Sequence, residues 1–300
     1  MRKINFTKMV ASGNDFVVIE KGHQSPCLAG RQAVISHQSL AKKICNRQYG
    51  VGADGLLVLE KSKVANVRIR IFNADGSEAS MCGNGARCVA LYVSRSPHPT
   101  AHSSQIKIET KVGLIESQVM GDNVKIKLTD PRDIRLNMPI KVNNRLLRVN
   151  FINTGVPHTV IFSEGLDEMD VFNLGRAIRF HKIFSPAGTN VDFVEVLGTN
   201  SLAIRTYERG VEDETLACGT GSVAAALIFN AQLLSLPTGQ AGAVSCQKIN
   251  VYTKSAETLE VYFKKKDSRF SDVWLKGKAK IVYKGEYYSN EGRTYGAKRT

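Results

Sequence analysis

The 300-residue chain is long enough for one large domain or two of ordinary size. Its composition, 43% hydrophobic and 23% charged, is typical of a globular protein and excludes a wholly disordered one. The formal net charge of +14 admits nucleic acid, an anionic membrane or an acidic small molecule as a partner. The basic residues are scattered, however, and no RRM-type recognition sequence occurs, so we expect a solvated basic surface and no nucleic-acid partner.

Neither secretion nor membrane insertion is expected. The N-terminal segment has no apolar core followed by a small-residue cleavage site. The longest apolar stretch, 223–234, contains Asn230 and Gln232 and is too short to span a bilayer. Six cysteines are too few for a disulfide scaffold, and no two form a CxxC pair. We therefore expect a cytoplasmic protein with reduced thiols.

Strands and helices are mixed along the chain. Apolar periodicity and turn residues predict four elements, in chain order a helix over 39–47 capped by Ser39, a strand over 67–71, a hairpin joining 113–120 to 124–128, and a helix over about 173–181. Segment 94–104 is expected to be an exposed loop.

Two further helices are predicted, each beginning just after a glycine-flanked cysteine. The first follows Cys82 and carries apolar residues at i, i+3, i+4 and i+7 from Ala86 onward. The second, 222–234, is apolar nearly all round, which is typical of a helix inside a core.

An internal repeat relates the two halves of the chain. In each half an Asn precedes an Asp-Phe-Val strand, at Asn14 and at Asn190, and a Cys-Gly-X-Gly turn follows at Cys82 and at Cys218. The same order twice predicts two copies of one module, with the boundary near Lys127.

A cysteine at the start of a helix suits acid–base chemistry. The unpaired N–H groups of the first turn and the helix dipole favour the thiolate, so we expect a lowered thiol pKa. Glycines after the cysteine let a carboxylate approach those N–H groups. Two such turns, with one sulfur on each side of an amino acid's α-carbon, would invert its configuration without a cofactor.

The other cysteines have a simpler interpretation. Cys45, Cys88 and Cys246 are expected to be small buried hydrophobes, and Cys27 a loop residue with no role. No histidine or further cysteine lies at ligand spacing from Cys82 or Cys218, so no zinc site is expected.

Two long motifs resemble those of the diaminopimelate epimerase family. Asn73–Cys88 is similar to the motif around that family's first cysteine, and Tyr207–Gly221 to the one around its second. The opening segments Phe6–Met9 and Gly13–Phe16, and the loop Gly188–Val191, resemble the family as well. The similarity extends from about residue 4 to 230, with a weaker match at 273–283.

The resemblance implies interconversion of LL- and meso-diaminopimelate with no PLP and no metal. It implies Cys82 and Cys218 as the acid–base pair, aided by His158, near the first cysteine, and by Glu208. The implied substrate-binding residues are Asn14, Asn73, Gly83, Asn84, Asn190, Glu208, Arg209, Gly219 and Thr220. Arg209 would bind the distal carboxylate, because its planar guanidinium can hold a carboxylate bidentately. Taken without the resemblance, His158 would be a structural histidine and Arg209 a surface ion-pair residue.

The chain departs from the family pattern where the distal end of the substrate would bind. Gly55 follows Asp54 where the family often has Gln, and Val156 stands where it has Asn. The opening reads Val10–Asn14 in place of His-Gly-Leu-Gly-Asn, and one extra residue lies between Gly210 and Cys218. None of these changes touches the cysteines.

The family analogy implies an α/β (α+β) fold of two pseudo-symmetric modules, each a curved, mainly antiparallel sheet around a central helix. The expected modules are residues 1–127 with about 275–300, and residues 128–274. We expect a small-molecule substrate, no membrane partner and a homodimer. Three alternatives stay open: a proline racemase-like enzyme, a binding protein of the same fold without catalysis, and a basic nucleic-acid-binding protein.

Overall fold

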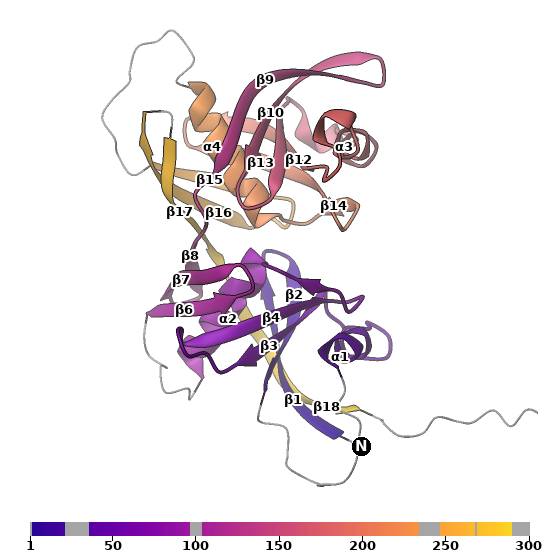
Figure 1. Cartoon of the computed structure of the whole chain (residues 1–300), viewed down its shortest axis with the longest axis vertical. Coiled ribbons are helices and arrows are strands. Elements are labelled where there is room, and N and C mark those ends of the chain that lie inside the picture. The colour runs from indigo at the N-terminus through magenta and orange to yellow at the C-terminus, as the bar shows by residue number, and fades with distance from the viewer. Residues whose placement is uncertain (1, 22–35, 97–103, 234–246, 268, 290–300) are drawn as a thin grey trace, which may run out of the picture. The chain divides into compact units, whose positions relative to one another are not determined.

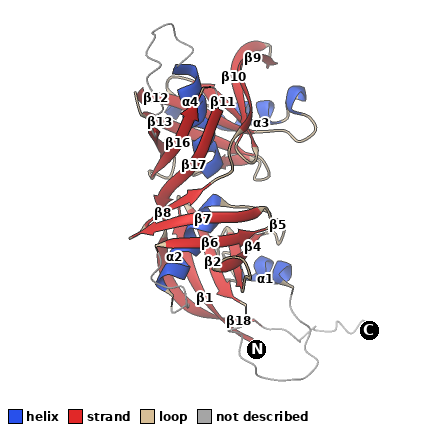
Figure 2. Cartoon of the chain, turned by 60° about the vertical axis from the view of Figure 1, so that its left-hand side comes forward, coloured by secondary structure: helices blue, strands red, loops and turns tan. Residues whose placement is uncertain are grey.

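The computed structural model describes residues 2–21, 36–96, 104–233, 247–267 and 269–289. The chain divides into two compact units (Figure 1). The first comprises residues 1–114 and 279–300, and the second residues 115–278. Within the described ranges both units are built mostly of strands, as Figure 2 shows in red.

The first unit contains the N-terminal strands and the last strand of the chain. Its elements are β1 (Arg2–Ala11), β2 (Asn14–Glu20), α1 (His37–Ile44), β3 (Gly55–Glu60), β4 (Val67–Asn73), β5 (Glu78–Ala79), α2 (Gly83–Arg95), β6 (Gln105–Thr110) and β18 (Lys280–Ser289). The strands pair in the order β18–β1–β2–β3–β4–β6, and β5 also pairs with β4. The pairs β2–β3 and β4–β6 are parallel and the others antiparallel.

The second unit contains the remaining elements. They are β7 (Gly113–Met120), β8 (Asn123–Lys127), β9 (Arg132–Val142), β10 (Arg145–Asn153), β11 (Pro157–Phe162), η1 (Leu166–Glu168), α3 (Val171–Arg179), η2 (Lys182–Phe184), β12 (Asn190–Gly198), β13 (Ser201–Glu208), β14 (Asp213–Thr215), α4 (Gly219–Leu233), β15 (Gln247–Thr253), β16 (Thr258–Lys266) and β17 (Arg269–Lys278). The strands pair in the order β9–β10–β11–β12–β13–β15–β16–β17–β8–β7, and β14 also pairs with β13. Only β11–β12 and β13–β15 are parallel among these described pairs.

The two units repeat one topology. In each, an antiparallel hairpin leads to a parallel pair, then to two antiparallel pairs, and the helix that follows the cysteine comes next. Strands β1–β6 therefore correspond to β10–β15, α1 to α3, and α2 to α4. The expected pair of mainly antiparallel modules is confirmed.

The strand correspondence corrects one half of the repeat predicted from the sequence. Asn14 opens β2, whereas Asn190 opens β12, which corresponds to β3. The matching Asp-Phe-Val segments thus lie on non-equivalent strands, because a short apolar strand pattern fits either of two neighbouring buried strands. The Cys-Gly-X-Gly turns do lie at equivalent places, before α2 and α4.

Helices α2 and α4 are the central helices of the two units (Figure 2). Helix α4 contacts strands β10–β13 and β15–β17, and its side chains from Val223 to Ile228 are all at most 1% exposed. The prediction that this helix, apolar nearly all round, lies in a core is confirmed.

Helices α1 and α3 pack on other strand surfaces through one apolar face each. Leu40, Ala41 and Ile44 of α1 join a cluster with residues of β1–β4, and α3 joins a cluster with β9–β13. Helix α1 is capped by Ser36, whose Oγ accepts a hydrogen bond from Ser39 N, and not by Ser39 as predicted. Ser36 is the residue placed to satisfy the N–H groups of the first turn, because the helix begins two residues earlier than expected.

The unit boundaries fall at 114/115 and 278/279, where 127/128 and 274/275 were expected. The predicted hairpin β7–β8 does form, but β8 then pairs with β17 through contacts such as Leu275 with Ile126. This pairing joins the hairpin to the second unit. Cys45 and Cys88 are buried as predicted, whereas Cys27, Cys246 and residues 97–103 lie outside the described residues. No helix in the described ranges is long and apolar enough to cross a membrane.

Candidate active site

Cys82 is the N-cap of α2. Its backbone is extended (φ −146°, ψ 117°), and its Sγ accepts a hydrogen bond from Gly85 N at 3.4 Å. Gly83 is the first residue of the helix. The thiol thus faces the N–H groups that the helix leaves without an intrahelical acceptor, as the sequence predicted.

Asn14 and Asn84 meet beside this helix end. Asn84 is buried and donates its Nδ2 to Asn14 Oδ1, and Asn14 Nδ2 donates to Asp54 Oδ2 at 3.2 Å. Asn84 Oδ1 in turn accepts from the buried guanidinium of Arg87. These contacts fix the orientation of both amides.

A charged network supports this arrangement. Arg47 donates to both carboxylate oxygens of Asp15 and to Asp54 Oδ1, and Lys8 lies 2.7 Å from Asp15. Burial alone would raise the pKa of Asp15, but hydrogen bonds from Arg47 and Lys8 outweigh it and hold that pKa well below its usual range. Asp15 therefore stays ionised next to Asn14.

Asn73 ends β4 in an exposed turn. Its Nδ2 donates to Ser77 Oγ at 2.9 Å, and its backbone N–H donates to Ser77 O. In the strand register Asn73 lies opposite Gly55. Among the described residues, no hydrogen bond joins Asn73 to Asn14 or Asn84.

Cys218 is the counterpart of Cys82 in the second unit, just before Gly219 and α4. It is only 7% exposed, and its Sγ lies 3.4 Å from Thr220 Oγ1. The N–H of Gly221 also stabilises its charged form, as Gly85 N–H contacts Cys82. Each cysteine therefore has the N–H of the third residue after it as a donor.

His158 and Asp192 form a fully buried pair behind Thr220. Both side chains are 0% exposed, and His158 Nδ1 lies 2.7 Å from Asp192 Oδ2. The other ring nitrogen, Nε2, lies 3.0 Å from Thr220 Oγ1. His158 was expected near the first cysteine, which belongs to the other unit. Within its own unit its contacts lead to Cys218, because β11 places it beneath the first turn of α4.

The expectation of a lowered thiol pKa is wrong for Cys218. Burial raises the pKa of this thiol well above its ordinary value, and the carboxylates of Glu208 and Asp192 raise it further. The Thr220 hydroxyl and the Gly221 N–H act in the opposite direction but do not compensate. The free-energy cost of removing the thiolate from water exceeds the stabilisation that the helix terminus gives it, so Cys218 is a neutral thiol.

Glu208, Asn190 and Arg209 lie together at the end of β13. Burial raises the pKa of Glu208. The hydrogen bond with Thr215 and the electrostatic effect of the nearby His158 act in the opposite direction but are weaker. Asn190 Oδ1 accepts from Arg209 N at 2.9 Å, while its Nδ2 donates to Pro157 O. Arg209 Nη1 donates to Ala187 O at 3.2 Å.

The predicted residues thus fall into two sets. Asn14, Asn73, Cys82, Gly83 and Asn84 belong to the first unit, and His158, Asn190, Glu208, Arg209, Cys218, Gly219 and Thr220 belong to the second. Each unit brings most of its own set to the N-terminal end of its central helix.

Asp192 and Thr206 are contributors to the second set that the sequence prediction omitted. Thr206 Oγ1 donates to Asp192 Oδ1 at 2.8 Å, so both oxygens of this buried carboxylate are hydrogen-bonded. A charged residue inside the apolar run Val191–Val194 was the available signal. Burial of a carboxylate requires such partners, and only the fold identifies them.

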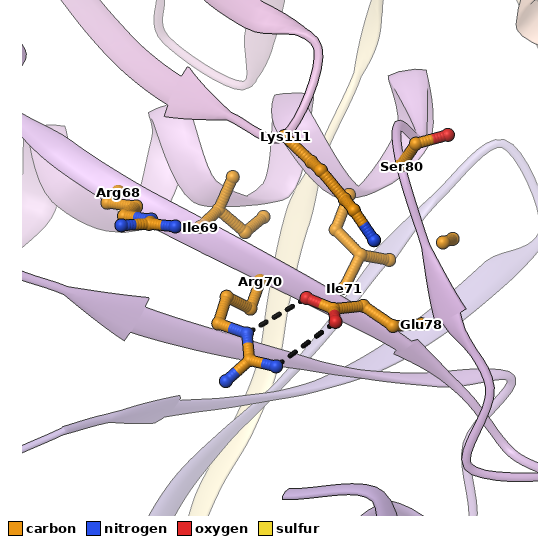
Figure 3. Close-up of a pocket in the computed structure, with 8 residues that line it drawn as sticks. Arg68, Ile69, Arg70, Ile71, Glu78, Ser80 and Lys111 are labelled. Atoms are coloured by element: carbon orange, nitrogen blue, oxygen red, sulfur yellow. Dashed lines mark hydrogen bonds and ion pairs between the residues drawn. The ribbon is translucent and has the colours of Figure 1, made fainter.

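A separate pocket of about 200 Å³ lies along β4 and β5 (Figure 3). Arg68, Arg70, Glu78, Ser80 and Lys111 are among its lining residues. Arg70 donates two hydrogen bonds to Glu78, at 2.9 and 3.1 Å, so its charge is already compensated. The described residues that line this pocket include none of the predicted site residues.

Solved structures share this fold at low sequence identity. A phenazine biosynthesis protein of the PhzF family from Bacillus anthracis superimposes with a TM-score of 0.69 at 17% identity, covering 95% of this chain and 99% of its own. A hydroxyproline epimerase from Agrobacterium vitis gives 0.65 at 13% identity, covering 95% and 91%. The fold is thus the two-unit class shared by PhzF-like proteins and proline racemase-like enzymes.

Sequence comparison narrows this class. The model of the diaminopimelate epimerase family matches residues 6–133 and 150–282. Diaminopimelate epimerases from Hydrogenobaculum sp. and Methanocella arvoryzae are each 39% identical to this chain, covering 93% and 95% of it and 96% and 97% of their own length. The enzyme from Archaeoglobus fulgidus is 42% identical over 76% of this chain and 82% of its own. The chain belongs to the diaminopimelate epimerase family.

Proposed function

We propose that this chain is an isomerase that interconverts LL- and meso-diaminopimelate with Cys82 and Cys218 as its acid–base pair. The observation that carries the proposal is the equivalent placement of the two cysteines. Each precedes the central helix of its unit, and each has the N–H of a glycine three residues later as a donor to its sulfur. Family membership supports the substrate.

In the proposed reaction one thiolate removes the α-proton while the other residue, as a thiol, delivers a proton to the opposite face. The first-turn N–H groups of α2 and α4 would hold the α-carboxylate and stabilise the charge that develops at the α-carbon. Asn84 and Thr220, with Gly83 and Gly219, would bind the α-carboxylate and amine of the reacting end. The chemistry needs no cofactor or metal in this proposal.

The residues that would bind the distal amino-acid end or close the pocket are Asn14, Asn73, Asn190, Glu208 and Arg209. Arg209 offers a guanidinium for the distal carboxylate, and Glu208 a carboxylate for an ammonium group. A substrate with two amino-acid ends matches this set better than proline does. The mechanism requires reduced cysteines, so the proposal includes a reducing, cytoplasmic location. It also includes a homodimer.

The test starts from pure LL-diaminopimelate and measures formation of the meso isomer by chiral chromatography. The reduced protein should produce the meso isomer without added PLP or metal, and Cys82→Ser and Cys218→Ser should lose at least about a thousandfold in kcat, the scale of losing a positioned acid or base. Proline and hydroxyproline serve as comparison substrates. Turnover of either in place of diaminopimelate would overturn the proposed specificity, and full activity in a cysteine variant would overturn the mechanism.

A further inference from the structure

A continuous chain of hydrogen bonds leads inward from the Cys218 sulfur. Cys218 Sγ lies 3.4 Å from Thr220 Oγ1, which lies 3.0 Å from His158 Nε2. His158 Nδ1 lies 2.7 Å from Asp192 Oδ2. The side chains of His158 and Asp192 are fully buried, so no water competes for the contact between them.

The chemistry of the groups fixes the direction of each bond. A carboxylate only accepts, so His158 Nδ1 carries the proton that is donated to Asp192. Nε2 of the neutral ring is then an acceptor, and the Thr220 hydroxyl must donate to it. The same hydroxyl oxygen is left to accept from the Cys218 S–H. All three bonds therefore point from the thiol towards Asp192.

We propose that Asp192 and Thr220 make this series of hydrogen bonds a proton relay, which converts the Cys218 thiol to a thiolate. The S–H bond of Cys218 breaks and its proton passes to Thr220 Oγ1, while the hydroxyl proton of Thr220 passes to His158 Nε2. The products are a thiolate and an imidazolium, and no atom or electron enters or leaves. Asp192 is a positioning residue that holds the His158 tautomer and stabilises the imidazolium.

The first unit shows that the fold does not require this polar pair. Strand register places Phe16 opposite Gly55 and His158 opposite Asn190, so Phe16 corresponds to His158. Leu57 corresponds to Asp192 by the same count. An apolar pair suffices beneath α2, so the buried carboxylate beneath α4 is not explained by packing alone.

The relay predicts an effect opposite in sign to that of simple charge repulsion. The titratable groups that act on Cys218 are Asp192 on β12, Glu208 on β13 and, through Thr220, His158 on β11. Of the strands packed on the far end of α4, β16 contributes Lys265, which contacts Asn230. If Asp192 acted only through space, its neutralisation would make Cys218 easier to deprotonate. If it acts through the relay, neutralisation makes the thiolate harder to form.

The test measures alkylation of Cys218 by iodoacetamide against pH, followed on the peptide that contains it by mass spectrometry. In Asp192→Asn and in the isosteric Thr220→Val, the pH midpoint of the alkylation rate should move to higher pH. Alkylation at pH 7.5 should then be roughly tenfold slower than in the wild type. Thr220→Ser keeps the hydroxyl and should stay within about twofold of wild type. A midpoint that moves to lower pH in Asp192→Asn, or that is unchanged in Thr220→Val, would overturn the relay.

Two variants calibrate this measurement. Glu208→Gln removes a carboxylate that acts on Cys218 without a relay contact, so its midpoint should fall. Asp170→Asn changes an exposed carboxylate at the N-cap of α3, and its midpoint should not move. Should Asp192→Asn fail to fold, the Thr220→Val and Thr220→Ser pair tests the same chain.

A second readout observes His158 directly. In ¹⁵N-histidine-labelled protein, with the signal assigned by His158→Gln, the wild-type ring should be protonated at Nδ1, and Asp192→Asn should lose that preference. An unchanged tautomer would contradict the positioning role. The relay rests on the proposed function only for the onward use of the thiolate, and neither readout needs a substrate. Failed epimerisation with both readouts intact would therefore reject the proposed function alone.

Discussion

Leu57 and Asp192 occupy equivalent positions in the two units, each against the glycine three residues after the cysteine. A Cβ added at Gly85 would lie 3.2 Å from Leu57 Cδ2, and one added at Gly221 would lie 2.4 Å from Asp192 Oδ1. The same backbone arrangement thus rests on an apolar side chain in one unit and on a hydrogen-bonded carboxylate in the other. The two half-sites are alike in geometry and different in polarity.

Gly221→Ala should destabilise the protein much more than Gly85→Ala. The Asp192 carboxylate is held by His158 and Thr206 and cannot move away from a new methyl group. Overpacking of this kind costs about 1–3 kcal/mol. The end of Leu57 can shift, so Gly85→Ala should change the free energy of unfolding by less than about 1 kcal/mol. Urea unfolding measures both, and equal losses would show that Asp192 is not rigidly held.

Arg205→Ala should cost more stability than Arg70→Ala. Each arginine binds a glutamate bidentately, Glu214 and Glu78 respectively. Arg205 is less exposed, at 17% against 33%, and it also donates to the carbonyl oxygens of residues 166, 167 and 169. We expect a loss of about 2–4 kcal/mol for Arg205→Ala and about 1 kcal/mol for Arg70→Ala in urea unfolding. The reverse order would contradict this account of the pairs.

Acid should weaken the second unit through Glu260. Burial opposes ionisation of this carboxylate, but hydrogen bonds from Lys276, Tyr262 and Lys248 lower its pKa to about 2. A lowered folded-state pKa contributes stability that is present above the unfolded value of 4.5 and is lost as pH falls from there towards 2. Glu260→Gln should therefore lower the unfolding free energy at pH 7 by up to about 3 kcal/mol and hardly change it at pH 2. A difference between the two proteins that does not vary with pH would refute this assignment.

Restoring the family's amides at positions 55 and 156 should have unequal results. A Cβ at Gly55 would lie 2.9 Å from the backbone oxygen of Phe72, so Gly55→Gln should lower the melting temperature. Val156 is only partly buried, so an asparagine side chain can take its place and Val156→Asn should fold normally. If position 156 contacts the substrate, the KM for diaminopimelate should change in Val156→Asn. An unchanged KM would place this side chain away from the substrate.

The strand register also relates the departures at positions 55 and 156 to the amides that the chain keeps. Asn14 and Val156 are equivalent, each lying two residues before Phe16 or His158, and Gly55 is equivalent to Asn190. Each unit therefore keeps one amide and lacks the other. The sequence alone showed the two losses but not this complementarity, because the apparent repeat had aligned Asn14 with Asn190.

Local patterns predicted the elements that carry the cysteines and the hairpin formed by β7 and β8. The Cys-Gly-X-Gly turns, the apolar helix 222–234 and the β7–β8 hairpin all follow from spacing and turn residues. The pairing of β8 with β17 joins residues about 150 positions apart and leaves no local signal. The unit to which the hairpin belongs could not be found from the sequence for that reason.

The chemistry of Cys218 was harder to predict than its position. The helix terminus argued for a lowered pKa, but the burial of the sulfur and the two nearby carboxylates reverse the direction. Neither carboxylate belongs to the cysteine's own helix: Asp192 comes from β12 and Glu208 from β13. Burial and long-range charge are properties of the packed structure, so the sign of this pKa shift needed the fold.

The central claim is that Cys82 and Cys218 together exchange the α-proton of diaminopimelate, and solvent isotope exchange tests it most directly. Reduced protein is incubated with LL-diaminopimelate in deuterated water, beside Cys82→Ala and Cys218→Ala, and the α-proton signal is followed by NMR. We predict deuterium incorporation together with formation of the meso isomer in the wild type, and loss of both in each variant. Undiminished exchange in either variant, or no exchange in the wild type, would contradict the claim.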